Sequence, residues 1–90
     1  MKMTVKLDGS LMTDRNELHD YLKLQLELPE YYGKNLDALY DILTERMIPV
    51  KIEFSSFNEA EISLGNYARS LADTLRDAAE DNPFLEIEFI

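Results

Sequence analysis

The chain has 90 residues, of which 46% are apolar, so we expect one compact domain spanning residues 1–90 around a modest hydrophobic core. The absence of cysteine excludes a disulfide framework, a thiolate metal site and a thiol nucleophile. The formal net charge of −9 disfavours binding to nucleic acid or to an anionic membrane surface, and it favours a basic protein partner.

The start of the chain predicts a strand and a helix rather than a targeting segment. The stretch MKMTVKLDGSLMT lacks the apolar run of a secretory signal, and no stretch reaches the roughly 18 apolar residues of a membrane span, so we expect a cytoplasmic protein. Met3–Leu7 alternates apolar and polar residues, which predicts a strand. A helix follows, capped by Thr13 or Asp14, and Pro29 is expected to end it, because the residue before a proline is disfavoured in a helix.

A second helix and a second strand are predicted in the middle of the chain. The helix begins after Gly33 with Asn35 as its N-cap, runs to about Met47 and is stopped by Pro49. Alternation of apolar and polar residues then predicts a strand at Val50–Phe54.

The last part of the chain completes an α/β pattern. Residues 55–65, SSFNEAEISLG, predict a short helical turn or a loop, and Asn66–Glu80 has the apolar spacing of an amphipathic helix. Phe84–Ile90 alternates as a closing strand. Strands separated by helical segments predict an α/β fold with a small, mainly parallel sheet.

The second predicted helix carries acidic residues four positions apart. At about 100° per residue, Asp37, Asp41 and Glu45 share one side of the helix. Asp41 lies in mid-helix, where like charges four residues apart cost about 0.2–0.5 kcal/mol per pair. Tyr40 borders this acidic stripe and Tyr31 precedes the cap, and tyrosine beside acids is typical of an interface that meets Arg or Lys. A solvated helix face is the alternative interpretation.

Other kinds of chemistry are disfavoured, and we expect no catalytic residues, no metal and no cofactor. A general acid and base need environments that separate their pKa values, and a solvent-facing helix provides none. Carboxylates strung along a helix cannot converge on one cation, and the chain has neither a calcium-loop motif nor a phosphate-binding glycine loop. His19, the only histidine, is expected to be a surface or a packed structural residue rather than a ligand or a base.

The segment LPEYYGKNLDALYDIL, residues 28–43, resembles the signature of the barstar family, intracellular inhibitors of barnase-type ribonucleases. That signature is a Tyr-Tyr-Gly turn followed by an Asn-Leu-Asp-Ala-Leu helix, and the order of the other predicted elements also matches. The resemblance implies one barstar-like domain with a three-stranded parallel sheet and helices mainly on one face. It also implies a stoichiometric inhibitor, not an enzyme, that forms a 1:1 complex with a basic, guanyl-preferring, barnase-like ribonuclease.

The resemblance further implies which residues bind the ribonuclease. Asp41 corresponds to a carboxylate that takes the place of an RNA phosphate in the active-site cleft, Asp37 to an acid that meets an arginine, and Tyr31 to a ring that packs on the catalytic histidine. A carboxylate offers guanidinium groups the charge and planar acceptor geometry that they bind bidentately. The expected partner-binding residues are Tyr31, Gly33, Asn35, Leu36, Asp37, Tyr40, Asp41 and Asp77.

The chain also departs from the family pattern. Tyr40 stands where the best-known member has a tryptophan, Lys34 replaces an acid, Asp77 is one carbon shorter than its usual counterpart, and Glu45-Arg46 replaces a glycine and an aromatic residue. An alternative function is therefore an acidic interaction or immunity module of the same fold that binds a basic partner other than a ribonuclease. A hydrolase that uses two acids of the stripe is a third, more distant hypothesis.

Overall fold

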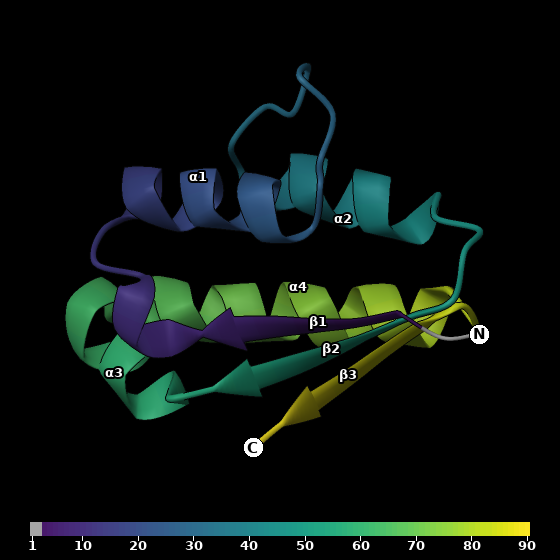
Figure 1. The fold of residues 1–90 in the computed structure, drawn as a ribbon. Helices are drawn as coiled ribbons and strands as arrows, with labels where there is room; N and C mark the ends of the chain where they lie inside the picture. The colour runs from purple at the N-terminus through teal and green to yellow at the C-terminus, as the bar shows by residue number, and fades with distance from the viewer. Residues whose placement is uncertain (1–2) are drawn as a thin grey trace.

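The protein has an α/β architecture built on a small parallel sheet (Figure 1). The computed structural model describes residues 3–90. In chain order the elements are β1 (Met3–Asp8), the 3₁₀ turn η1 (Gly9–Leu11), α1 (Arg15–Gln25), α2 (Leu36–Thr44), β2 (Val50–Ser55), α3 (Phe57–Leu64), α4 (Asn66–Asp81) and β3 (Leu85–Phe89). β2 is the central strand, and β1 and β3 pair parallel to it on either side. The predicted three-stranded parallel sheet is confirmed.

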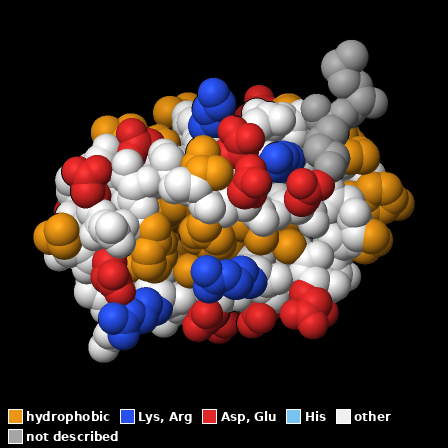
Figure 2. Space-filling view, turned by 90° about the horizontal axis from the view of Figure 1, so that it is seen from below, with side chains coloured by type: hydrophobic (Ala, Val, Ile, Leu, Met, Phe, Trp, Pro, Cys, Tyr) orange, Lys and Arg blue, Asp and Glu red, His pale blue; other side chains and the backbone are white. Residues whose placement is uncertain are grey.

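The sheet has one covered face and one open face. Along β2, Val50, Ile52 and Phe54 are buried, whereas Lys51 and Glu53 between them are half-buried. This alternation is expected of a strand whose side chains point to opposite faces of a sheet with one packed face. The helices lie mainly on the covered face, as predicted, and α4 packs against both α2 and β3 (Figure 1). Seen from the side opposite α1 and α2, the surface carries charged side chains around an apolar strip (Figure 2).

Helix α1 begins where the sequence predicted and ends earlier. Asp14, one of the two candidate caps, accepts a hydrogen bond from a backbone N–H of the first turn. The prediction that Pro29 ends the helix is wrong, because the chain leaves the helix three residues before that proline. Glu27 has a φ of 53°, and the N–H of Leu28 donates to the carbonyl of Lys23 at 2.9 Å. This left-handed closure ends the helix and satisfies its last carbonyls.

Helix α2 also begins at its predicted cap and is shorter than predicted. The Asn35 side chain accepts a hydrogen bond from the backbone N–H of Ala38 at 2.7 Å, which confirms the N-cap. The helix ends at Thr44, and Met47 lies outside it with 76% of its surface exposed, so the prediction that the helix continues to Met47 is wrong. The physical reason is a contact that is distant in the sequence: the side chain of Asn82 donates to carbonyls at the end of α2.

The segment between β2 and α4, predicted as a helical turn or a loop, is helix α3. The turn η1 packs against this helix. A Cβ atom on Gly9 would lie 2.2 Å from the carbonyl oxygen of Ser56, which directly precedes α3. Only glycine therefore allows this close backbone approach, which joins the end of β1 to the second half of the chain.

Candidate functional site

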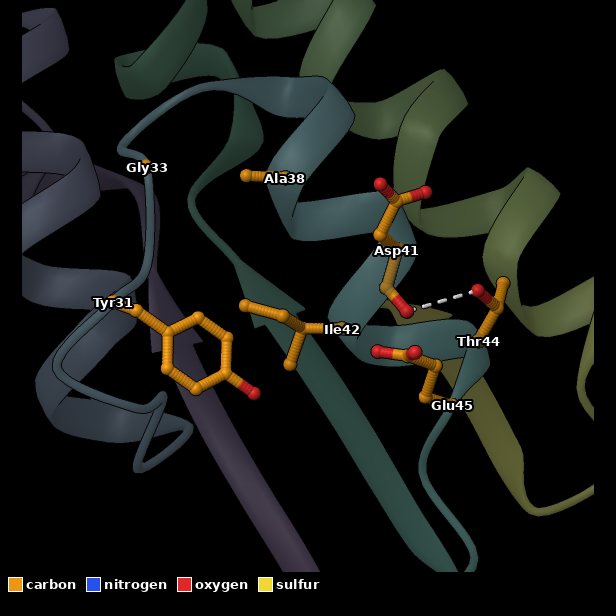
Figure 3. A pocket seen from close by; sticks show the side chains of 7 residues that line it. All are labelled: Tyr31, Gly33, Ala38, Asp41, Ile42, Thr44 and Glu45. Atoms are coloured by element: carbon orange, nitrogen blue, oxygen red, sulfur yellow. Dashed lines mark hydrogen bonds between the residues drawn. The ribbon is translucent and has the colours of Figure 1, made fainter.

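A shallow groove runs between the loop before α2 and the outer side of that helix (Figure 3). Its volume is ≈ 520 Å³. Three of the sequence-predicted site residues, Tyr31, Gly33 and Asp41, lie in its lining. The full lining consists of Tyr31, Gly33, Ala38, Asp41, Ile42, Thr44 and Glu45. The groove therefore combines an aromatic wall, an apolar floor and two carboxylates.

The two adjacent tyrosines of the loop differ in their exposure to solvent. Tyr31 is 81% exposed and stands at the groove, whereas Tyr32 is 6% exposed and belongs to the core. The Tyr32 hydroxyl lies 2.5 Å from Nδ1 of His19, and Nε2 of His19 lies 2.7 Å from the hydroxyl of Tyr67 on α4. His19 is 2% exposed, so of the two predicted positions it has the packed structural one. The loop that carries Tyr31 is thus anchored through one imidazole to both α1 and α4.

Burial lowers the pKa of His19, because the charged imidazolium loses hydration in this position. The positive charges of Lys34 and Arg15 lower it further, and Asp20 opposes them. The anchoring imidazole is therefore neutral at pH 7. The pKa of Tyr32 is raised, chiefly by burial, so its hydroxyl also stays neutral.

The start of α2 holds the loop to the helix. Besides capping the helix, Asn35 donates from Nδ2 to the Gly33 carbonyl at 3.2 Å. A Cβ on Gly33 would lie 3.2 Å from that amide nitrogen, so a side chain at this position would press on the cap and project at the groove. Leu36 is half-buried against the core. Asn35 and Leu36 therefore have structural roles in the free protein, whatever they contact in a complex.

The cations nearest to the acidic stripe in the sequence do not neutralise it. Lys34 has a φ of 54° and pairs with Asp20 of α1 at 2.6 Å. Arg46 donates to the backbone carbonyl of Leu26 at 2.5 Å. Among residues 3–90, neither Asp37 nor Asp41 has an ion pair with a basic side chain. The acids of the stripe are exposed.

Packing of α4 against α2 adds acids from a second helix. The Tyr40 hydroxyl donates a hydrogen bond to Asp81 at the end of α4. This hydrogen bond is the main reason that the pKa of Tyr40 is raised, and burial and the negative charges of Asp81, Asp77 and Asp41 act in the same direction. Tyr40 is thus surrounded by carboxylates from both helices. The charges of Asp77 on α4 and Asp41 on α2 both act on the Tyr40 hydroxyl, so the two helices contribute acids to one acidic region.

The sequence missed part of the groove. Ala38, Ile42 and Thr44 line it, and Glu45 was placed in the acidic stripe but not in the site. Figure 3 shows Glu45 on the groove side of the last turn, beyond Asp41. The helical spacing of these residues is compatible with one face, but their use depends on how the preceding loop folds back over α2. Asp81 was also missed, because nothing local connects it to Tyr40.

The acids and the tyrosine around the groove are suited to contact with cationic side chains. Exposed carboxylates on a rigid helix can accept paired hydrogen bonds from guanidinium groups, and the adjacent tyrosine ring offers a flat apolar surface. Within residues 3–90, no group of three or more His, Cys, Asp or Glu side chains is placed to hold a metal ion. Across the same residues, no helix has the length and apolar character needed to span a bilayer.

Comparison with known proteins places the chain in a family. The family model described as Barstar (barnase inhibitor) matches residues 2–89. A relative from Bacillus subtilis (strain 168), named "Putative ribonuclease inhibitor YrdF", is 37% identical over 76 residues, which cover 83% of this chain and 84% of the relative. These matches extend over nearly the whole fold and confirm that the chain is an inhibitor-family protein and not an enzyme. The chain belongs to the barstar family of barnase inhibitors.

Proposed function

We propose that this protein inhibits a barnase-like ribonuclease by occupying the active-site cleft with the acidic face of α2. The observation that carries the proposal is Asp41, an exposed and unneutralised carboxylate at the rim of a groove walled by Tyr31. A ribonuclease cleft must present cationic groups to hold RNA phosphates, and such groups complement this face.

The proposed mechanism is phosphate mimicry. The Asp41 carboxylate accepts hydrogen bonds from guanidinium or ammonium groups as a phosphate would, but it offers no bond that the enzyme can cleave. The Tyr31 ring, 81% exposed at the other side of the groove, packs on an imidazole of the cleft. Inhibition therefore needs steric blockage and charge complementarity, without any chemistry on the inhibitor.

The proposed partner-binding residues divide by role. Asp37, Asp41 and Asp77 meet basic groups of the ribonuclease, and Tyr31 and Tyr40 provide aromatic contact area. Gly33, Asn35 and Leu36 act mainly through the backbone and by holding the loop in place. The complete proposed set is Tyr31, Gly33, Asn35, Leu36, Asp37, Tyr40, Asp41 and Asp77.

The net charge of −9 also affects how fast the complex forms. Opposite charges steer a basic enzyme toward the acidic face and raise the association rate, and salt weakens this effect. We propose a 1:1 complex, because one acidic face fills one cleft. The proposed compartment is the cytoplasm, where a cell must protect its own RNA from such an enzyme.

A second candidate function is binding to a basic toxin or regulator that is not a ribonuclease. The observation that favours it is Glu45, which adds a second carboxylate to the groove where the family pattern has a glycine. An additional charge at this position changes which partner side chain the groove accepts.

The test is a titration of a purified barnase-type ribonuclease with this protein, at low and at high salt. We expect a sharp equivalence point at a 1:1 ratio and slower association at high salt. Asp41→Asn keeps the side-chain shape and removes the charge. We expect it to weaken inhibition by at least about 30-fold, which corresponds to the roughly 2 kcal/mol of a binding hot spot. Glu59→Gln is the matched control, since Glu59 is an exposed acid on α3 that is not part of the proposed face.

Inhibition that is unchanged in Asp41→Asn would refute the phosphate-mimic mechanism. A wild-type protein that does not inhibit, but binds another basic protein through Asp41, would instead support the second candidate function.

A further inference from the structure

The acids of the proposed binding face come from two helices that are far apart in the chain. Asp41 lies on α2 and Asp77 on α4. A partner that contacts both carboxylates requires the two helices to keep a fixed position relative to each other. Apolar packing alone lets helices slide by small amounts, so directional contacts between them determine how well the two acids are aligned.

The structure contains such contacts at the carboxyl-terminal end of α4. The Tyr40 hydroxyl donates to the Asp81 carboxylate, which joins the middle of α2 to the last turn of α4. In the next residue, Asn82, Nδ2 donates to the carbonyls of Leu43 at 2.8 Å and Arg46 at 2.9 Å. These hydrogen bonds connect two consecutive residues at the end of α4 to Tyr40 and Leu43 of α2 and to Arg46, which follows that helix. We call Tyr40, Asp81 and Asn82 the α2–α4 latch.

The latch reinforces the local end of α2, where the backbone N–H groups of Glu45 and Arg46 donate to Asp41 and Leu43. The last carbonyls of a helix lack partners within the helix, and they are commonly satisfied by a glycine in the left-handed conformation. Helix α2 has no such residue, since its C-cap Glu45 has a φ of −87°, and it has no basic side chain in its last turn. Asn82 adds a donor from outside the helix at Leu43, whose carbonyl also accepts a long bond of 3.4 Å from the N–H of Arg46. Asn82 is 3% exposed, and its Oδ1 accepts from the backbone N–H of Phe84 at 2.9 Å, which fixes the orientation of the amide.

We propose that the α2–α4 latch positions the acidic face for its partner, with Tyr40, Asp81 and Asn82 acting as positioning residues; this inference rests on the proposed function. The latch fixes the alignment of Asp41 with Asp77 before binding. A preorganised face loses less conformational freedom on binding, so its benefit is found mainly in slow dissociation of the complex.

The test must separate positioning from the negative charge of Asp81. Tyr40→Phe removes the hydrogen bond and no charge, and Asp81→Ala removes both. Asp81→Asn removes the charge but keeps an oxygen that can accept from the Tyr40 hydroxyl, so it is the conservative rescue variant. Tyr21→Phe is the matched control, because it removes a tyrosine hydrogen bond of 2.9 Å to the backbone N–H of Asp8, on other elements of the fold.

We expect Tyr40→Phe to raise the dissociation rate from a barnase-type ribonuclease about 5- to 10-fold, with association changed by less than about twofold. At high salt, where charge effects are screened, Asp81→Ala should have the same effect and Asp81→Asn should resemble the wild type. The double variant Tyr40→Phe/Asp81→Ala should be no worse than either single variant, because both remove one shared contact. Tyr21→Phe should dissociate like the wild type.

Additive effects in the double variant, or wild-type dissociation in Tyr40→Phe, would overturn the proposal. A second measurement does not depend on the ribonuclease: amide hydrogen exchange in the last turn of α2 should become faster in Tyr40→Phe and stay unchanged in Tyr21→Phe. If the wild type fails to inhibit, the proposed function fails, and unchanged exchange in Tyr40→Phe would separately refute the latch.

Discussion

Charged side chains have different surroundings on two faces of this protein. On the open face of the sheet, Lys51 of β2 lies 3.7 Å from Glu53 and 3.2 Å from Glu88 of β3, and these carboxylates raise its pKa. On the face formed by α2 and α4, Asp41 and Asp77 have no basic partner among the described residues. Lys51 offsets part of the negative charge of the sheet within the fold, whereas Asp41 and Asp77 are available to another molecule.

This contrast teaches more than the total charge does. A net charge of −9 is compatible with a protein that is merely well solvated. Mutual repulsion on α2 opposes helix formation, and the fold does not relieve it, because Lys34 pairs with α1 and Arg46 with the backbone. Unrelieved repulsion beside an exposed aromatic ring is therefore the better indicator of a binding face.

Reversing one charge on each face should give the largest difference in binding between the two faces. We expect Asp41→Lys to weaken binding to a barnase-type ribonuclease by about 4 kcal/mol or more, roughly 10³-fold, because it places like charges together in the complex. Glu53→Lys makes the same change in net charge on the open sheet face and should alter the equilibrium dissociation constant by less than about threefold. Calorimetric titration of both variants measures this difference, and equal losses would show that total charge alone controls binding.

Removal of the exposed aromatic ring should reduce binding and leave stability unchanged. Tyr31 is 81% exposed, so Tyr31→Ala should leave the free energy of unfolding within about 0.5 kcal/mol of the wild type. The same change should weaken the complex by about 2 kcal/mol, as expected for a tyrosine anchor. Urea unfolding and ribonuclease inhibition check the two parts, and a large loss of stability would mean that Tyr31 supports the fold.

The stability that His19 gives to the loop should depend on pH. Burial lowers the pKa of His19 below its usual value of 6.5, so the unfolded chain binds a proton more readily than the folded one. Stability from the neutral imidazole is therefore present above pH 6.5 and is lost as the pH falls below that value. Urea unfolding between about pH 5.5 and 8 should show this loss, and His19→Gln should remove the slope.

The smallest expected effects are changes in the free energy of unfolding, which should have opposite signs for mutations on the two faces. Asp41→Asn relieves repulsion on α2 and should raise the free energy of unfolding by about 0.2–0.5 kcal/mol. Glu53→Gln weakens an ion pair of the open face and should lower it by a similar amount, at most about 0.5 kcal/mol. Matched urea unfolding curves test the signs, and two changes in the same direction would contradict the contrast.

Local patterns predicted the parts of the fold that local forces determine. The alternation at Val50–Phe54 identified the central strand, because side chains on a strand alternate between two faces. The cap at Asn35 was found because its side chain bonds to an amide only three residues away. The predicted ends of α1 and α2 were wrong because no local sequence signal marks them. A left-handed Glu27 ends α1 without a glycine signal, and α2 ends on a side chain that lies 39 residues after Leu43.

In the candidate site, too, local sequence patterns predicted some features, and others depend on contacts that are distant in the sequence. The acidic stripe and the Tyr-Tyr-Gly turn could be read from residues 31–45, but the groove depends on how the loop folds over α2. The contact between Tyr40 and Asp81 joins residues 41 positions apart, and no spacing rule connects them. Residue pattern alone does not say which tyrosine of the pair faces outward, and only the family resemblance implied that it is Tyr31. His19 resolves this question, since it binds the hydroxyl of Tyr32 inside the core and leaves Tyr31 at the surface.

These neighbouring tyrosines have a consequence for how such an inhibitor can change its target during evolution. Tyr32, held by the buried imidazole, maintains the path of the loop, and Tyr31 contributes almost nothing to that path. Mutations at position 31 can therefore alter partner preference without unfolding the protein, whereas mutations at position 32 remove the support on which any new preference would depend. The fold separates, within one dipeptide, a position free to diversify from a position under structural constraint.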